Sequence, residues 1–467
     1  MLDYFPRYFS VRAIICYVVT LFLVSIIFFS YALPFQFMLF GFAAVCLFFV
    51  FAHQTTYQWR VVPQHMFTKK LFFTAMAIRM VYVIFIYFYY IAETGQPFMF
   101  HSGDESFYHY IGTVWPTMGF REMRKQVNMY VGLSDSGYPW WIGLVYRIFG
   151  THVLSGRLVK CVIDAFSCVL VYNLAKRNFG EATGRMAAIF CMLMPNMWYY
   201  CGITLKETEM AFVTLLFVER SDNVVHASKV KIFDMLIPLL CIFVAFTFRT
   251  ALALVLGLSL AIALVFTSGR QLSALKKVMY GVAFSVWMLT SVGVEIVQET
   301  QQVWEQRSEN QVIGYEERAK REGGNVFSRY VSGVVAAPMI FTIPFSSMVY
   351  IEDQENQMML NGANFIKNVT SGLTIFALFV LLLSGDWRKH VLPLATMGGY
   401  LVVIAFSNFA HSERFHFPVL ALELMFAAYG ITLLQNKHKR WFVLWLVFIG
   451  MINIGWAWFK LAGRGLV

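Results

Sequence analysis

Long apolar runs alternate with short polar segments along the whole chain. A helix needs about 20 apolar residues to cross the hydrocarbon core of a bilayer, and runs of about 15–17 residues are borderline. By this measure the chain holds about thirteen candidate spans, or about 11–13 if the borderline runs are treated strictly. The candidates lie near residues 11–33, 34–52, 71–92, 153–175, 186–200, 203–219, 232–248, 250–267, 278–296, 363–384, 391–409, 415–435 and 441–459. The pattern predicts an all-α polytopic membrane protein that forms one domain over residues 1–467.

The composition excludes the soluble classes of protein. Hydrophobic residues make up 59% of the 467 residues and charged residues only 13%, against about 25% charged residues in an ordinary globular domain. So little charge cannot cover the surface of a soluble protein of this size. The sequence also has no glycine-rich phosphate loop, zinc-binding helix or serine-elbow motif, which argues against nucleotide hydrolases, zinc proteases and serine hydrolases.

Basic residues gather on one side of the predicted spans, and carboxylates lie mostly on the other. The positive-inside rule places such basic segments in the cytoplasm. We therefore expect a multi-pass protein of the plasma membrane, or bacterial inner membrane, with a cytoplasmic N-terminus. The net charge of +11 is spread over short loops, which does not suggest nucleic-acid binding. The basic segments contain Arg60, Lys69, Lys70, Lys176, Arg177, Arg185, Arg388 and Lys389.

Two segments on the predicted external side are longer than a simple connection requires. They cover residues 93–152 and 297–362, and long loops in compact proteins are usually functional. The first contains the sequence HSGDESFYHY and the amphipathic sequence GYPWWIGLVYRIFG, which predict interfacial helices. The second begins polar and then becomes apolar around Pro338 and Pro344, as an interfacial or re-entrant segment would. We expect the first segment to be catalytic and the second to cover the acceptor or donor.

Two adjacent carboxylates, Asp104 and Glu105, lie early in the first long segment. A carboxylate at the membrane surface can deprotonate an acceptor hydroxyl as a general base. The alternative is structural: Asp104 would form the N-cap of a short helix, with Glu105 in its first turn. The length of the segment and the cations described next favour catalysis.

Several cations fall near the same predicted face of the membrane. Ionisable groups at this depth usually face a shared cavity, and arginine binds phosphate in a bidentate manner. The candidates for a phosphate site are Arg157, Lys206, Arg249, His411 and Arg414. Each could instead extend toward lipid headgroups.

Three further ionisable residues lie within predicted spans. Lys160 and Asp164 share a helix face with Arg157, so a Lys160–Asp164 pair that only joins helices is a second alternative. Arg79 lies inside the third span, where it either pairs with a carboxylate or extends toward the cytoplasm; we assign it no role.

Three stretches together resemble the GT-C glycosyltransferases, which use polyprenyl-phosphate-linked sugars, and especially the protein O-mannosyltransferases and lipid A aminoarabinose transferases. GDESFYHY resembles the Asp-Glu signature of the family's first external loop. The run from YPWWIGLVYRIFG to MPNMWYY resembles its interfacial helix and the spans that follow, and ERFHFPVLALELMFAAYG resembles a late Arg-x-x-x-Pro helix. The segment 297–362 matches no pattern of the family, so the acceptor is left open among glycan, lipid and protein.

The resemblance implies a mechanism and a set of roles. Asp104, beside Glu105, would be the base of an inverting transfer from a polyprenyl-phosphate sugar to an acceptor hydroxyl on the external face. Arg249 and Arg414, with Lys206, Arg157 and His411 as further candidates, would hold the donor phosphate. No cofactor or metal is required by the sequence, although a divalent cation such as Mg or Mn at Asp104 stays open, as in some relatives.

Two other functions stay open from the sequence. A polymerase or ligase of O-antigen type, using polyprenyl-diphosphate glycans, would make residues 297–362 catalytic and Asp104 incidental. A lipid or polysaccharide transporter would be favoured by charges at the membrane midplane and by an internal repeat; the sequence shows no repeat, and Arg79 is its main midplane charge.

Overall fold

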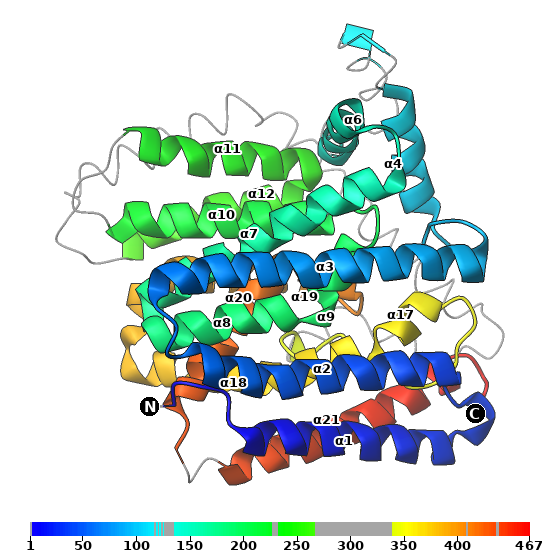
Figure 1. Cartoon of the computed structure of the whole chain (residues 1–467). Coiled ribbons are helices and arrows are strands. Elements are labelled where there is room, and N and C mark those ends of the chain that lie inside the picture. The colour runs from blue at the N-terminus through cyan, green and yellow to red at the C-terminus, as the bar shows by residue number, and fades with distance from the viewer. Residues whose placement is uncertain are drawn as a thin grey trace.

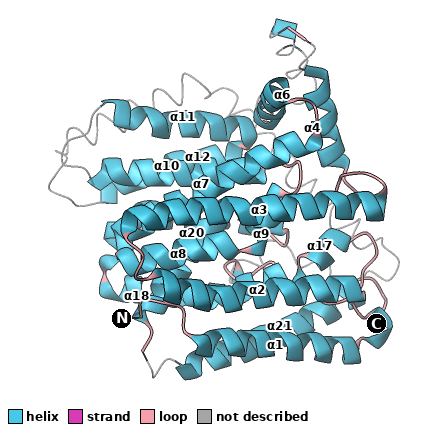
Figure 2. Cartoon of the chain, viewed as in Figure 1, coloured by secondary structure: helices cyan, strands magenta, loops and turns pink. Residues whose placement is uncertain are grey.

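The structure is a computed structural model of the whole chain, and the described residues fall in six main stretches. They are 2–115, 135–226, 232–266, 339–407, 410–435 and 439–467, together with the short pieces 118–119, 121–122 and 125. Within these stretches the chain is almost entirely helical, and the sole strand-like contact is an isolated bridge between Ala32 and Val349. The all-α prediction is confirmed (Figure 2).

Helices coincide with all predicted spans that lie within the described residues, whereas the predicted span 278–296 falls outside them. Among the described residues, seven helices are long and apolar enough to cross a membrane: α1, α2, α3, α7, α18, α20 and α21. The elements are α1 (Arg7–Ile27), η1 (Phe29–Tyr31), α2 (Phe35–Trp59), α3 (Gln64–Thr94), α4 (Gly103–Val114), α6 (Gly137–Phe149), α7 (Val153–Phe179), α8 (Glu181–Leu193), α9 (Pro195–Cys201), α10 (Glu207–His226), α11 (Ile232–Phe248), α12 (Thr250–Phe266), α17 (Glu355–Met359), α18 (Asn361–Ser384), η4 (Asp386–His390), α19 (Val391–Ala405), α20 (Glu413–Leu433) and α21 (Lys439–Ala462).

Two predicted spans are divided in the structure. The first run ends as a helix at Ile27 and continues as the short η1 turn. The run 186–200 becomes α8 and α9, which are separated at Met194. The break follows from Pro195, because proline has no N–H to donate and its ring clashes with the preceding turn.

The long helices lie roughly parallel to one another, so the connections gather at two ends of the bundle (Figure 1). One end carries α4, α6, α17 and the C-terminus, and is named the α4 end. The other carries the N-terminus and the connections from α2 to α3 and from α18 to α19, and is named the η4 end. The two ends correspond to the predicted external and cytoplasmic sides respectively.

Packing is closest around α20, the central helix, whose apolar stretch is 89% buried. It contacts α18, α8, α10 and α19. Helix α18 also crosses α2 at Gly41 and Gly362, where a Cβ atom on Gly362 would lie 2.3 Å from the Gly41 carbonyl oxygen. Small residues at such crossings let membrane helices approach closely. This core fixes the N-terminus of α20, which carries Arg414, relative to the α4 end.

Candidate active site

Helix α4 presents Asp104 to solvent at its first turn. Its N-cap residue is Ser102, so the alternative that Asp104 forms the cap is wrong. A carboxylate in the first turn is nevertheless stabilised by the partial positive charge of the helix N-terminus. The Asp104 side chain is 57% exposed, and one of its oxygens lies 2.6 Å from Nη1 of Arg414. Asp104 is therefore an accessible carboxylate beside a cation.

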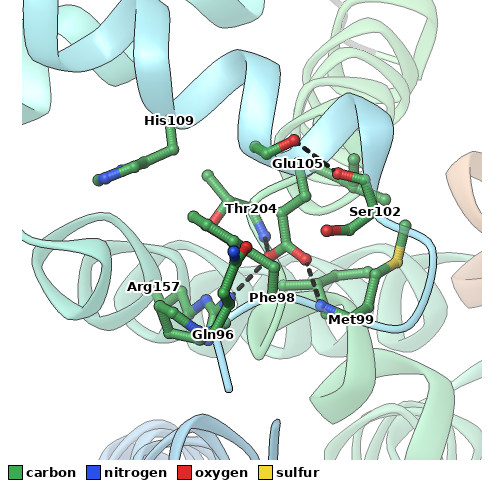
Figure 3. Close-up of polar contacts among 12 residues, drawn as sticks. Gln96, Phe98, Met99, Ser102, Glu105, His109, Arg157 and Thr204 are labelled. Atoms are coloured by element: carbon green, nitrogen blue, oxygen red, sulfur yellow. Dashed lines mark hydrogen bonds and ion pairs between the residues drawn. The ribbon is translucent and has the colours of Figure 1, made fainter. Parts of the chain in front are cut away.

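Glu105 is completely buried, and its carboxylate lies among Arg157, Thr204 and Met99 (Figure 3). Its Oε1 accepts hydrogen bonds from Arg157 Nη2 at 2.6 Å and from the Thr204 backbone N–H at 2.5 Å. Its Oε2 accepts one from the Met99 backbone N–H at 2.8 Å. Both oxygens are occupied, so Glu105 fastens the start of α4 to α7 and to the turn 202–206.

Arg414 contacts two carboxylates at the N-terminus of α20. Its Nη1 binds Asp104, and its Nε donates to Oε1 of Glu207, the first residue of α10. The other Glu207 oxygen is buried without a hydrogen-bond partner among the described residues. Arg414 thus joins α4, α10 and α20 at one point.

Lys206 and Arg249 extend this cluster of charges. Lys206 Nζ lies 2.5 Å from an Asp135 oxygen and donates to the Phe248 carbonyl at 2.9 Å. Arg249 lies between α11 and α12, as its tight-turn position predicts, and donates to the Tyr400 hydroxyl at 2.9 Å. Its guanidinium also sits 4.4 Å from the centre of the Phe415 ring. Phe415 follows Arg414 directly, so the three predicted cations meet at the α4 end.

The two remaining candidates for phosphate binding have other surroundings. Arg157 is fully buried and donates to Glu105 and to the Pro97 carbonyl. Its Nε and Nη1 have no hydrogen-bond partner among the described residues. His411 stacks on the Trp456 ring of α21, with 5.1 Å between the ring centres.

The ionisable residues on α7 also have different partners from those expected. Lys160 donates to the carbonyls of Ile203 and Leu205, so it holds the turn 202–206. Asp164 pairs with Arg79 on α3. The alternative of a Lys160–Asp164 pair is therefore wrong, and an Arg79–Asp164 pair joins α3 to α7 instead.

Tyr108 is a neighbour of the cluster that sequence reasoning missed. Its side chain is buried against the Tyr138 ring, with 4.8 Å between ring centres. Burial raises the pKa of the Tyr108 hydroxyl, and the nearby Arg414 guanidinium partly opposes that shift. Tyr108 therefore stays neutral at physiological pH. The signal in the sequence was its spacing of four residues from Asp104, one helical turn.

The part of the chain that the structure describes contains no group of three His, Cys, Asp or Glu side chains placed to hold a metal. The single observed partner of Asp104 at the cluster is the Arg414 guanidinium. The expectation of a divalent cation at Asp104 stays open.

Comparison with known proteins gives one match. Residues 137–294 match the family described as dolichyl-phosphate-mannose-protein mannosyltransferase. The match covers about a third of the chain, including Arg157, Lys206 and Arg249, whereas Asp104 and Arg414 lie outside it. None of the curated proteins or solved structures compared with the chain matches it. The matched family belongs to the GT-C superfamily, as the sequence resemblance implied, and the apolar helices agree with it. The chain is a membrane glycosyltransferase of the GT-C type.

Proposed function

We propose that this glycosyltransferase moves a sugar from a polyprenyl-phosphate donor to an acceptor hydroxyl at the α4 end, with inversion at the anomeric carbon. The observation that carries the proposal is the exposed Asp104 carboxylate in contact with Arg414, in one cluster with Lys206 and Arg249. A base and several cations are the groups such a transfer requires.

Asp104 is the general base in this proposal. An Asp104 oxygen takes the proton of the acceptor hydroxyl while the acceptor oxygen forms a bond to the anomeric carbon. The bond from that carbon to the phosphate oxygen breaks in the same step, so one displacement inverts the configuration. The exposure of Asp104 supports this role, because the acceptor can reach it.

The cations bind the phosphate that leaves. Negative charge grows on the phosphate as the glycosidic bond breaks, and cations already in place stabilise that charge more than they stabilise the ground state. Arg249, Lys206 and Arg414 are the residues we assign to this role, since they meet at the cluster. His411, three residues before Arg414, is a more distant candidate.

Glu105 and Arg157 act as positioning residues in this proposal. Their buried ion pair joins the base-carrying helix to α7, and neither side chain is accessible to a substrate. The sequence grouped Glu105 with the catalytic base and Arg157 with the phosphate site. Because both side chains are buried, we assign them instead to holding α4 in position against α7.

Arg79, the midplane charge that would favour a transporter, is held by several partners within the protein. Arg79 binds Asp164 and the carbonyl oxygens of Cys191 and Met192 at 3.2 and 3.3 Å. A pair with this many fixed partners suits a structural role better than an ion pathway. The external site, the donor and the inversion are what the next experiment tests.

The test is sugar transfer by the purified protein in detergent. Polyprenyl-phosphate sugars and a mixed envelope extract are supplied, and release of polyprenyl phosphate is followed for wild type, Asp104→Asn and Asp353→Asn. Asp353 is an exposed carboxylate at the same end, outside the cluster, so it is the matched control. We expect Asp104→Asn to lower kcat by about 10²–10⁴-fold, the usual contribution of a general base, and Asp353→Asn to stay near wild type.

The opposite result has a clear meaning. Turnover that survives Asp104→Asn in folded protein would remove Asp104 as the base. It would move the chemistry toward residues 297–362, as the polymerase alternative requires. Retention of configuration in the product would contradict the single displacement.

A further inference from the structure

A large apolar groove lies between α2 and α3. Its cavity volume is about 980 Å³, near the upper end of the range of about 300–1,000 Å³ usual for ligand sites. Ala43 and Ala44 on α2 face Ala77 on α3 across it, and these small side chains leave the space open. Parts of α8, α9 and α18 form its floor. Figure 1 shows α8 and α9 in the space between α2 and α3.

The lining of the groove suits a hydrocarbon chain. None of its lining residues is charged. Leu47 on α2 and Val81 and Phe85 on α3 are exposed along it, so the groove opens on the lipid-facing surface of two membrane-spanning helices. A polar ligand would lose its hydration there without gaining hydrogen bonds.

The length of the groove indicates a long chain. Its lining on α2 extends from Leu39 to Trp59, about 30 Å at about 1.5 Å per residue. That equals the thickness of the bilayer hydrocarbon core, about 30 Å. A lipid confined to one leaflet would fill only half of it, whereas a chain of polyisoprenoid length fits its whole depth.

The groove leads to the segment that carries Asp104. Phe40, which lines the groove, contacts Tyr89 on α3 with 5.1 Å between ring centres, and Tyr89 contacts Phe100 at 6.3 Å. Phe100 precedes Asp104 by four residues, and Asn356 of α17 donates to its carbonyl at 2.8 Å. A chain in the groove would therefore carry its head toward Asp104.

Two of the cations that we assign to the donor phosphate, Lys206 and Arg249, lie outside the groove. Helix α3 packs on α7, α7 on α10, and α10 on α11 and α12 (Figure 1). Lys206 precedes α10 and Arg249 joins α11 to α12, and neither residue lines the groove, whose closest approach to α10 is through α9. An inverting displacement needs the acceptor to approach from the face opposite the leaving phosphate.

We propose that the α2–α3 groove binds the hydrocarbon chain of a lipid-linked acceptor, so that its hydroxyl reaches Asp104 while the donor phosphate binds the cations of the cluster. The proposal rests on the proposed function for the role of its occupant. It goes beyond that function because it names the chemical class of the acceptor: a long-chain lipid carrying a hydroxyl-bearing head.

The first test detects the chain without catalysis. The protein is placed in nanodiscs that contain a long-chain polyprenol with a diazirine in its isoprenoid chain, and adducts are mapped after illumination. We expect the groove-lining face to carry about tenfold more adducts than the Val50 face of α2, a difference of about 1.4 kcal/mol in occupancy. Ala44→Trp and Ala77→Trp, each of which fills the groove, should remove that excess. Val50→Trp is the control, because Val50 is 38% exposed on the same helix but does not line the groove.

The second test identifies the occupant as the acceptor. Labelled donor is supplied with the lipid-extractable fraction or the delipidated protein fraction of the envelope, and donor hydrolysis by water is measured without acceptor. We expect label in the lipid fraction, and a loss of about tenfold or more in that transfer for Ala44→Trp and Ala77→Trp, since the acceptor is no longer positioned. Donor hydrolysis should change less than about twofold, and Val50→Trp should match wild type.

Each other outcome contradicts the proposal in a distinct way. Label in the protein fraction, or lipid transfer unaffected by both groove-filling variants, would overturn it while the proposed function stands. Parallel loss of donor hydrolysis would show that the groove holds the donor chain. Equal labelling of the groove and the Val50 face would show that no chain is held. Lack of transfer to either fraction by wild type would overturn the proposed function and the acceptor role with it.

Discussion

Asp104 and Glu105 are neighbours in sequence but differ completely in surroundings. Successive residues on an α-helix point about 100° apart, so one of two adjacent carboxylates can face solvent while the other faces the interior. Here Asp104 is exposed beside Arg414, and Glu105 is buried on Arg157. Substitution of Asp104 should therefore affect activity, whereas substitution of Glu105 should affect stability.

Glu105→Gln should destabilise the protein. The substitution removes the charge that balances the buried Arg157 guanidinium, while the amide oxygen can still accept from Thr204 or Met99. Breaking a buried pair from one side typically costs about 3–5 kcal/mol. We expect a clear fall in the thermal midpoint of the purified protein in detergent, measured beside Asp104→Asn. A larger fall for Asp104→Asn would reverse our assignment of the two roles.

The sequence identified both carboxylates but could not say which one faces solvent. That choice depends on Arg157 from α7 and on the backbone of Met99 and Thr204, which meet Glu105 only in the folded chain. The same holds for the cations. Arg157 and Arg249 could not be told apart in sequence. Arg157 forms a buried ion pair with Glu105, whereas Arg249 donates a hydrogen bond to the Tyr400 hydroxyl at the cluster.

At the scale of elements, the break between α8 and α9 explains Arg79, which had no role in our sequence interpretation. Pro195 has no N–H, so it leaves the carbonyl of Cys191, four residues earlier, without its usual helical partner. Arg79 donates to that carbonyl and to the next one, while Asp164 balances its charge. The Arg79 guanidinium thus supplies hydrogen bonds to carbonyls at the end of α8.

Arg79→Met should lower the free energy of unfolding by about 3–5 kcal/mol, because Asp164 would be left as an uncompensated buried charge. The double variant Arg79→Met/Asp164→Leu should recover part of the loss, since it removes both charges. The α8 carbonyls would still lack the hydrogen bonds from Arg79, so the double variant should stay less stable than wild type. Thermal unfolding in detergent measures all three proteins. A double variant no more stable than Arg79→Met would mean that the carbonyl contacts, rather than the charge, dominate.

The η4 turn gives the protein a sensitivity to acid. His390 packs on the Phe179 ring and its Nδ1 is hydrogen-bonded to Asn178 Oδ1 at 2.7 Å. Burial lowers the pKa of His390 to about 4, from an ordinary value of 6.5; Asp222 and Asp386 oppose that shift, while His226 and Lys389 add to it. Between pH 6.5 and 4 the unfolded chain therefore binds this proton more readily than the folded one.

Stability should consequently fall as the pH drops from 6.5 toward 4, and this contribution should level off below that value. His390→Gln keeps a hydrogen-bonding group but cannot take up a proton in this range. We expect the difference in thermal midpoint between pH 7 and pH 5 to be smaller in His390→Gln than in wild type. An equal difference in both proteins would assign the acid sensitivity to other groups.

For the whole molecule, the sequence predicted where the helices lie along the chain, but not which helix ends come together in the fold. Apolar length determines where a chain crosses a bilayer, so the predicted spans coincide with helices throughout the described residues. The order in which helices pack has no such local signal. Contacts such as Arg414 with Asp104, 310 positions apart, and a groove between α2 and α3 depend on that order.

The distribution of charges predicts the orientation of the whole bundle, which can be measured directly. Lys389 is 73% exposed at the η4 end, where basic residues gather, and Asp353 is 78% exposed at the α4 end. From the positive-inside rule we expect the η4 end in the cytoplasm and the candidate active site outside.

Single cysteines at these two positions test that orientation in intact cells. A membrane-impermeant maleimide should label Asp353→Cys at once and Lys389→Cys only after the membrane is opened. The seven native cysteines give little background, because five are buried and the other two, Cys16 and Cys46, are half-buried within α1 and α2. The reverse labelling pattern would put Asp104 in the cytoplasm. The donor sugar would then have to be used on the side where nucleotide sugars are made, which removes the main reason for a lipid-linked donor.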